Sequence, residues 1–292
     1  MSKTKKAVII GSVLVGIGVI IGFIGIAIGG FKFPNGAVDL TTMKALHAEK
    51  KTVQIADVFD KIEIAGASSM DIEICKSKTG KNYVEYYDTD DWTSRVDVKD
   101  RVLKFTTDDK GKHKAIVSLG FGKDTAARLY LADAEYKEIS VTTLSGYVTI
   151  QDVNAETVNV SASSGDLYMK NINVPDSIMA TSSSGDIDLE NATAKQIELG
   201  ANSGDIEMQD ITAESLRMST SSGDIDLESC DAEKFDITTS SGDVDMEITA
   251  GRTYRFETKT NSGAVDVPDG DADSGYLCKI VTSSGDVDVK QK

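Results

Sequence analysis

The sequence predicts an all-β protein built as a parallel β-solenoid, resembling a β-helix, with coils of about 19 residues, an irregular β cap at its N-terminal end and one transmembrane helix before the cap. Three observations support this prediction. A Ser-Gly pair recurs at nearly constant spacing, apolar and polar residues alternate around each pair, and a 24-residue segment near the N-terminus contains no charged residue.

The repeat occupies the C-terminal half and is marked by one glycine in each copy. Consecutive glycines are separated by 19, 20, 19, 19, 19, 21 and 22 residues. A unit so short cannot bury a core alone, so we expect each copy to form one coil stacked on its neighbours. The glycines that mark the corners of these coils are Gly146, Gly165, Gly185, Gly204, Gly223, Gly242, Gly263 and Gly285.

Apolar columns run through all copies. The second and fourth residues after each glycine are Val, Ile, Leu or Met, and the seventh residue before it is apolar. The third residue before it is always Thr, Ser or Ala. This alternation predicts two strands per coil, each with one buried face. Cys230 and Cys278 fall in apolar columns, so we expect both to be buried, unbridged thiols.

We interpret each Ser-Gly pair as a tight corner between the two strands. Glycine there would supply a backbone conformation that residues with a Cβ avoid. The serine before each glycine is expected to hydrogen-bond the corner backbone and the neighbouring coils.

Composition divides the chain into five parts. Residues 1–6 form a cytoplasmic N-terminus, 7–30 a transmembrane helix, 31–52 a polar tether, 53–138 the irregular β cap, and 139–292 the solenoid. A cap is expected because the first coil would otherwise expose an unpaired edge and an open core.

The uncharged segment is long enough to cross a membrane, since 24 helical residues span about 36 Å. Lys3, Lys5 and Lys6 precede it, which favours a cytoplasmic N-terminus and a C-terminal domain outside the cell. A cleaved signal peptide is the alternative, although the apolar core of such a peptide usually has only about 7–15 residues.

Four glycines share one face of this predicted helix. Their spacing contains GxxxG twice, a pattern that favours a homodimer through the membrane helix. The alternative is that glycine is simply frequent in membrane helices. The residues of this face are Gly18, Gly22, Gly25 and Gly29.

The net charge of −16 excludes nucleic acid as a partner, because phosphate binding requires a basic surface. Residues 141–292 hold 28 acidic and 10 basic residues, so the acidity belongs to the repeat. The two histidines, His47 and His113, lie apart from any nucleophile or ligand cluster. We therefore expect no catalytic residue, no cofactor and no specific metal site.

Two acidic rows should follow the corners. The first row directly follows the glycine, and the second lies two residues further along the strand. They predict a surface that attracts cations weakly, although each carboxylate of the first row could instead accept a corner N–H. The candidate residues are Asp186, Asp188, Asp205, Asp224, Asp226, Asp243 and Asp245.

An alternative interpretation is a polysaccharide-active or polysaccharide-binding β-helix. Carboxylates two residues apart on a strand are separated by about 6.6 Å, and inverting glycosidases use a similar distance. The pair recurs in coil after coil, however, whereas an active site is normally one local departure from a repeat. We therefore expect no enzyme.

The string Ser-Ser-Gly-Asp-Ile-Asp-Leu, present at 183–189 and 221–227, resembles the repeats of a bacterial family of putative adhesins. The resemblance covers about residues 55–292 and implies a membrane-anchored cell-surface domain of unknown function, in some relatives linked to cell-envelope stress. It implies a non-catalytic adhesin-like or envelope-associated scaffold. The expected partners are the membrane and an envelope polymer or surface protein.

Overall fold

The computed structural model describes residues 37–39, 44–45, 48–67, 70–89, 92–109, 116–118, 126–249 and 251–292. All regular elements in these ranges are strands, and none of the described segments is a helix long and apolar enough to span a bilayer. The predicted transmembrane helix at 7–30 and its glycine face at Gly18, Gly22, Gly25 and Gly29 lie outside the described residues. The chain separates into two compact units.

The smaller unit contains a three-stranded antiparallel sheet in the order β2–β1–β9. Its strands are β1 (Ala37–Asp39), β2 (Lys44–Ala45) and β9 (Ile116–Ser118). β9, which falls within the predicted cap, pairs with β1, which falls within the predicted tether.

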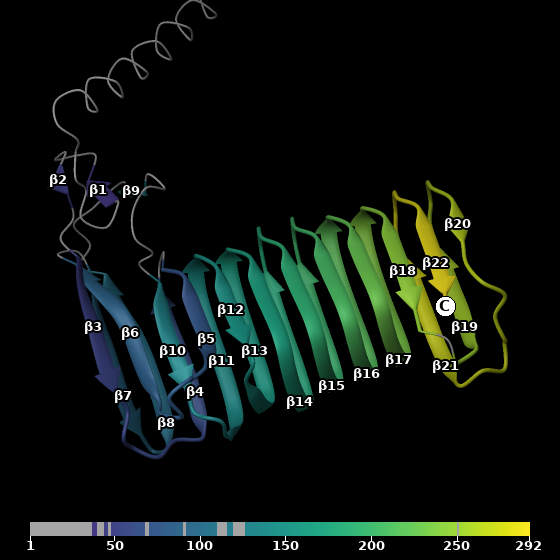
Figure 1. Cartoon of the computed structure of the whole chain (residues 1–292). Helices are drawn as coiled ribbons and strands as arrows, with labels where there is room; N and C mark the ends of the chain where they lie inside the picture. The colour runs from purple at the N-terminus through teal and green to yellow at the C-terminus, as the bar shows by residue number, and fades with distance from the viewer. Residues whose placement is uncertain are drawn as a thin grey trace, which may run out of the picture. The chain divides into compact units, whose positions relative to one another are not determined.

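The larger unit is a parallel β-solenoid, which confirms the predicted fold class for this part of the chain. Its central strands stack in parallel along the solenoid in chain order (Figure 1). Ile187 pairs with Ile206, which pairs with Ile225, so each step advances one copy of the repeat. The strands are β11 (Glu135–Ser145), β12 (Val148–Gln151), β13 (Asn154–Ser164), β14 (Leu167–Ser182), β15 (Ile187–Ala201), β16 (Ile206–Ser222), β17 (Ile225–Ser241) and β18 (Val244–Ile248).

A second bend follows six residues after each of five corner glycines. The residue there has φ between 50° and 56°, a left-handed conformation that Asn and Asp tolerate better than most residues. These bend residues are Asp152, Asn171, Asn191, Asp210 and Ser229. Asn191 Nδ2 donates to Asn171 Oδ1 at 2.8 Å, so side chains also connect neighbouring bends.

The predicted apolar columns form the core. Ile187 and Leu189 after the corner, and Ile197 and Leu199 before the next, are buried, as are their counterparts in the central coils. Cys230 and Cys278 are unbridged and fully buried, which confirms the prediction for these thiols. Burial raises the pKa of both thiols to about 12.

The parallel stack already begins within the predicted cap, because β4 (Lys61–Ala67) and β5 (Ile72–Lys76) form a further coil beside β11 and β12. β10 (Ala127–Leu131) pairs in parallel with β5, and β8 (Val102–Asp109) pairs in parallel with β4, so the parallel stack continues by one more layer. Three antiparallel strands then close this end: β6 (Tyr83–Thr89) on β10, β3 (Ala48–Gln54) on β6, and β7 (Trp92–Lys99) on β8.

The last two copies stack in inverted order. β21 (Tyr276–Val281) and β22 (Val287–Gln291) lie against β17 and β18, whereas β19 (Tyr254–Lys259) and β20 (Val265–Asp266) lie outside them (Figure 1). The Gly263 coil is therefore the physical end of the solenoid. Val265 is 42% exposed, whereas the equivalent Val244 is fully buried, because no further coil covers it.

Candidate functional site

Successive coils approach most closely at the corner glycines. A Cβ added at Gly204 would lie only 2.2 Å from the carbonyl oxygen of Gly185. The sequence interpretation attributed these glycines to an unusual backbone conformation, which is correct only for Gly146, Gly263 and Gly285. At the other corners φ lies outside the left-handed region, so contact between coils, not φ, excludes a side chain.

The aspartates that directly follow the corner glycines form a ladder along the stack. The N–H of Asp224 donates to Oδ1 of Asp205 at 2.8 Å, and the N–H of Asp243 donates to Oδ1 of Asp224 at 2.8 Å. The ladder ends where Ala264 donates its N–H to Asp286 Oδ1 at 2.7 Å. Ala264 lies in the outermost coil, where a carboxylate would find no further N–H. This first acidic row therefore has a structural role.

Hydroxyl groups inside the corner form a second set of bonds between coils. Thr220 Oγ1 donates to the Gly204 carbonyl at 3.1 Å, and Thr239 Oγ1 to the Gly223 carbonyl at 3.3 Å. The sequence shows that the third residue before each corner glycine is small. It does not show that the hydroxyl of this residue bonds to the glycine carbonyl of the neighbouring coil. Serines that precede the corner glycines also connect coils through their backbone, as where the Gly242 N–H donates to the Ser284 carbonyl.

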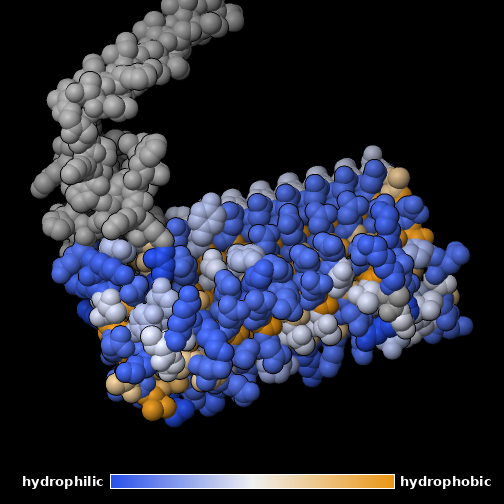
Figure 2. Space-filling view, viewed as in Figure 1, coloured by the Kyte–Doolittle hydropathy of each residue, from blue (hydrophilic) through white to orange (hydrophobic). Residues whose placement is uncertain are grey.

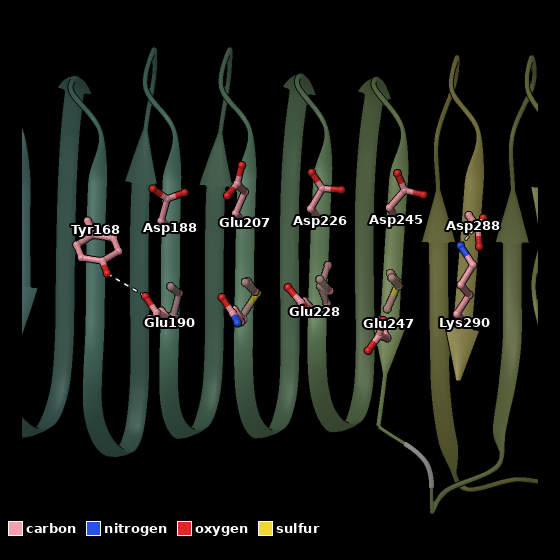
Figure 3. Close-up of a pocket in the computed structure, with 15 residues that line it drawn as sticks. Tyr168, Asp188, Glu190, Glu207, Asp226, Glu228, Asp245, Glu247, Asp288 and Lys290 are labelled. Carbon is pink, nitrogen blue, oxygen red and sulfur yellow. Dashed lines mark hydrogen bonds and ion pairs between the residues drawn. The ribbon is translucent and has the colours of Figure 1, made fainter. Parts of the chain in front are cut away.

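The second acidic row lines an open groove of about 570 Å³ on the outer face of the strands that follow the corners (Figure 3). We call it the acidic groove. Eight carboxylates and one lysine line it. Its central row is Asp188, Glu207, Asp226, Asp245 and Asp288, which pair in register on successive strands.

The seven aspartates predicted as a weak cation surface therefore fall into two sets. Asp186, Asp205, Asp224 and Asp243 belong to the corner ladder. Asp188, Asp226 and Asp245 belong to the acidic groove. Glu207 completes the groove row, and the sequence prediction did not include it among the candidates.

Repulsion and burial disfavour full ionisation of the groove. Burial raises the pKa of Asp188 to about 6, and the charge of Glu207 adds to the shift. Burial also raises the pKa of Asp226, and the charge of Asp245 raises it further. Unit charges one strand apart, about 4.8 Å, repel by about 0.9 kcal/mol in bulk water before salt screening.

Among the described residues, cationic side chains neutralise only the ends of the groove. At one end Lys170 and the Tyr168 hydroxyl both donate to Glu190, which they hold in place. At the other end Lys290 pairs with Asp288 at 3.0 Å. Lys292 pairs with Glu247 at the same end.

The middle of the groove remains uncompensated. Within the described part of the chain, Glu207, Asp226 and Asp245 have no Lys or Arg nitrogen within 4 Å. Figure 2 shows hydrophilic side chains over most of the visible face of the solenoid.

The carboxylates are arranged as a row rather than as a cage. The described residues contain no group of three or more His, Cys, Asp or Glu placed to hold a metal ion. Calcium requires about six to eight converging oxygens, whereas the groove row offers one carboxylate per strand (Figure 3). Such a row suits a ligand that carries several cationic groups at regular intervals.

Comparison with known proteins identifies a family and several similar structures. The family model described as Toastrack DUF4097 matches residues 59–290. No functionally curated protein matches the chain. A putative adhesin of Bacteroides fragilis is 18% identical, with a TM-score of 0.49, over 84% of this chain and 97% of its own.

Two further solved structures show lower similarity. A putative adhesin of Parabacteroides merdae is 13% identical, with a TM-score of 0.45, over 83% of this chain and 96% of its own. A putative lipid binding protein of Parabacteroides distasonis is 16% identical, with a TM-score of 0.37, over 83% of this chain and 96% of its own.

Proposed function

The chain belongs to the Toastrack DUF4097 family, and we propose that it is a non-catalytic binding scaffold of the cell envelope whose acidic groove holds a cationic envelope polymer. The regularity of the groove supports a scaffold, because its carboxylates recur in the same register from coil to coil. A catalytic centre would instead depart from the repeat at one place.

The observation that carries the proposal is the uncompensated row of Glu207, Asp226 and Asp245 between Asp188 and Asp288. Each solvent-exposed ion pair contributes at most about 1 kcal/mol. Asp288 already pairs with Lys290, so four such pairs would give about 4 kcal/mol, which corresponds to a Kd of about 1 mM. A polymer that engages several copies of the protein would bind more tightly through multivalency.

We also propose that residues 7–30 anchor the protein in the cell membrane and display residues 32–292 outside the cell. The support is the uncharged segment preceded by Lys3, Lys5 and Lys6. The glycine face of this segment would bring two copies together as a homodimer. Protease added to intact cells should remove the solenoid and leave a small membrane fragment, and complete protection of the solenoid would contradict this orientation.

The groove is tested with full-length protein in nanodiscs of zwitterionic lipid and a fluorescent hexalysine probe. The groove variant replaces the central carboxylates by amides: Asp188→Asn, Glu207→Gln, Asp226→Asn and Asp245→Asn. The control variant removes the same number of charges from exposed positions elsewhere: Glu156→Gln, Glu198→Gln, Glu214→Gln and Glu233→Gln.

We expect the groove variant to bind at least about tenfold more weakly and the control to change by less than about twofold. Binding should weaken with salt because the contacts are exposed. The Tm of the groove variant should not fall, since amides relieve repulsion. Equal losses in both variants would show that net charge, not the groove, attracts the probe.

A further inference from the structure

The sheet face that carries the acidic groove continues beyond it over β12, β5, β10 and β6. The groove row passes from Tyr168 to Thr149, Glu73 and Arg128. Arg128 Nε and Nη2 donate to the two Glu73 carboxylate oxygens at 2.7 and 3.1 Å, so this pair is neutral as a unit. The face therefore changes from acidic to mixed polar at Tyr168.

Three half-buried tyrosines lie on this continuous face. Tyr83 and Tyr130 stack with ring centroids 4.4 Å apart and an interplanar angle of 16°. Tyr168 lies at the boundary with the acidic groove, and Figure 3 shows its ring beside the carboxylate row with the hydroxyl directed to Glu190. The 2.9 Å bond from that hydroxyl to Glu190 Oε2 fixes the ring. Two amide side chains lie in the same row of residues, since Gln54 pairs with Tyr83, and Gln151 pairs with Cys75, which in turn pairs with Tyr130.

We propose that this face is a track for a linear glycan with free amino groups, whose sugar rings pack on Tyr168 and Tyr130 while its ammonium groups pair with the acidic groove. A pyranose has an apolar C–H face and a rim of hydroxyls. Tyrosine offers an apolar ring and a polar tip, and side-chain amides and the Glu73–Arg128 pair can bond the rim. This inference rests on the proposed function and names the class of polymer.

The tyrosines, and not the spacing of the charges, favour a glycan over a cationic peptide. Carboxylates recur once per strand, about every 4.8 Å, and an extended peptide presents side chains on one side about every 6.6–6.8 Å, so three peptide intervals nearly match four carboxylate intervals. A row of carboxylates can therefore bind either polycation. Only a glycan offers the apolar face of a sugar ring to the half-buried rings of Tyr168 and Tyr130.

The test compares three probes on full-length protein in zwitterionic nanodiscs. They are a β-1,4-linked glucosamine hexamer, its fully N-acetylated form and hexalysine. The variants are Tyr168→Ala and Tyr130→Ala. Tyr168→Phe keeps the ring but loses the hydroxyl, and Tyr147→Ala removes a 60% exposed tyrosine at a corner as a control. The Tm of each variant checks that the cap remains folded.

We expect Tyr168→Ala and Tyr130→Ala to weaken the glucosamine hexamer and its acetylated form about five- to tenfold and to leave hexalysine unchanged. Tyr168→Phe, which keeps the ring, should lose less affinity than Tyr168→Ala, and Tyr147→Ala should stay within about twofold of the native protein. If hexalysine binds as tightly as the glucosamine hexamer and no tyrosine matters, the glycan inference is wrong while the cationic groove stands. If only the acetylated hexamer binds, the cationic groove and the amino-glycan inference are both wrong.

Discussion

The replacement Gly204→Ala perturbs the contact on which the stack of coils depends. Its Cβ would lie 2.2 Å from the Gly185 carbonyl oxygen and 2.7 Å from the Gly185 carbonyl carbon. Because both are backbone atoms, the two coils would have to separate locally by about 1 Å to restore normal contact distances. Neither side-chain rotation nor a flexible loop can absorb the overlap.

The loss in the free energy of unfolding has two sources, the overpacking at the corner and the hydrogen bonds that the separation of the coils stretches. Overpacking alone costs about 1–3 kcal/mol. The separation also stretches the 2.9 Å bond from Asp205 N–H to Asp186 Oδ1 and the 3.1 Å bond between the Ser203 N–H and the Ser183 carbonyl. At about 0.5–1.5 kcal/mol for each bond, the total with the overpacking is about 2–6 kcal/mol. For a domain of this size that corresponds to a Tm lower by roughly 10 °C.

Gly200→Ala is the matched control, because it lies in the same coil. A Cβ there would be 3.6 Å from Ser219 Oγ and 3.7 Å from Thr181 Cγ2, which are ordinary contacts. This variant should be unchanged or more stable by up to about 1 kcal/mol. Thermal melting followed by circular dichroism measures both. A Gly204→Ala protein that melts within about 2 °C of the Gly200→Ala protein would refute the steric argument.

Three further predictions concern the ladder, the thiols and the groove. Asp224→Ala removes the acceptor of the Asp243 N–H and should lower the free energy of unfolding by about 1 kcal/mol. Asp224→Asn keeps an oxygen acceptor and should lower it less. Equal losses in the two variants would contradict the role of the ladder. Cys230 and Cys278 should react with a polar maleimide only as the protein unfolds, and rapid labelling of the native protein would contradict the assignment of inward columns. The pKa of Asp188 is raised to about 6 in the folded state, so the native protein holds more protons than the unfolded chain between about pH 4 and 6 and loses stability as pH rises through that window. The Tm of Asp188→Asn relative to the native protein should therefore increase from about pH 4 to pH 7, and a constant difference would argue against the raised pKa.

The coil architecture could be predicted because its signals are local and repeated. An apolar residue two and four positions after every glycine fixes which side of a strand is buried, and Ile187 and Leu189 are buried accordingly. The same argument placed Cys230 in the core. The reason for the corner glycine could not be read from the sequence, since a left-handed φ and a close backbone contact both exclude a Cβ.

The inverted order of the last two coils left only indirect traces in the sequence. Both copies carry the same columns, so either could stack on the Gly242 coil. The longer spacings of 21 and 22 residues supply the extra chain that the crossover requires. Ala264, which replaces the ladder aspartate, marks the true end of the stack.

The candidate site was only partly visible in the sequence. The alternation showed two exposed acidic rows but not that the first bonds to the next coil while the second lines a groove. Tyr83 and Tyr130 reach the groove face through the pairing of β6, β10 and β5, which lie outside the repeat in sequence. No local periodicity encodes such long-range, partly antiparallel contacts.

The acidic groove as a binding surface is tested most directly by carboxyl footprinting. The native full-length protein in nanodiscs is modified with a carbodiimide and a neutral amine, with and without the glucosamine hexamer, and each carboxylate is quantified by mass spectrometry. We predict that the ligand protects Glu207, Asp226 and Asp245, while exposed Glu198 and Glu214 react at unchanged rates. Protection that is uniform over all five residues, or confined to the last two, would contradict the groove as the site of binding.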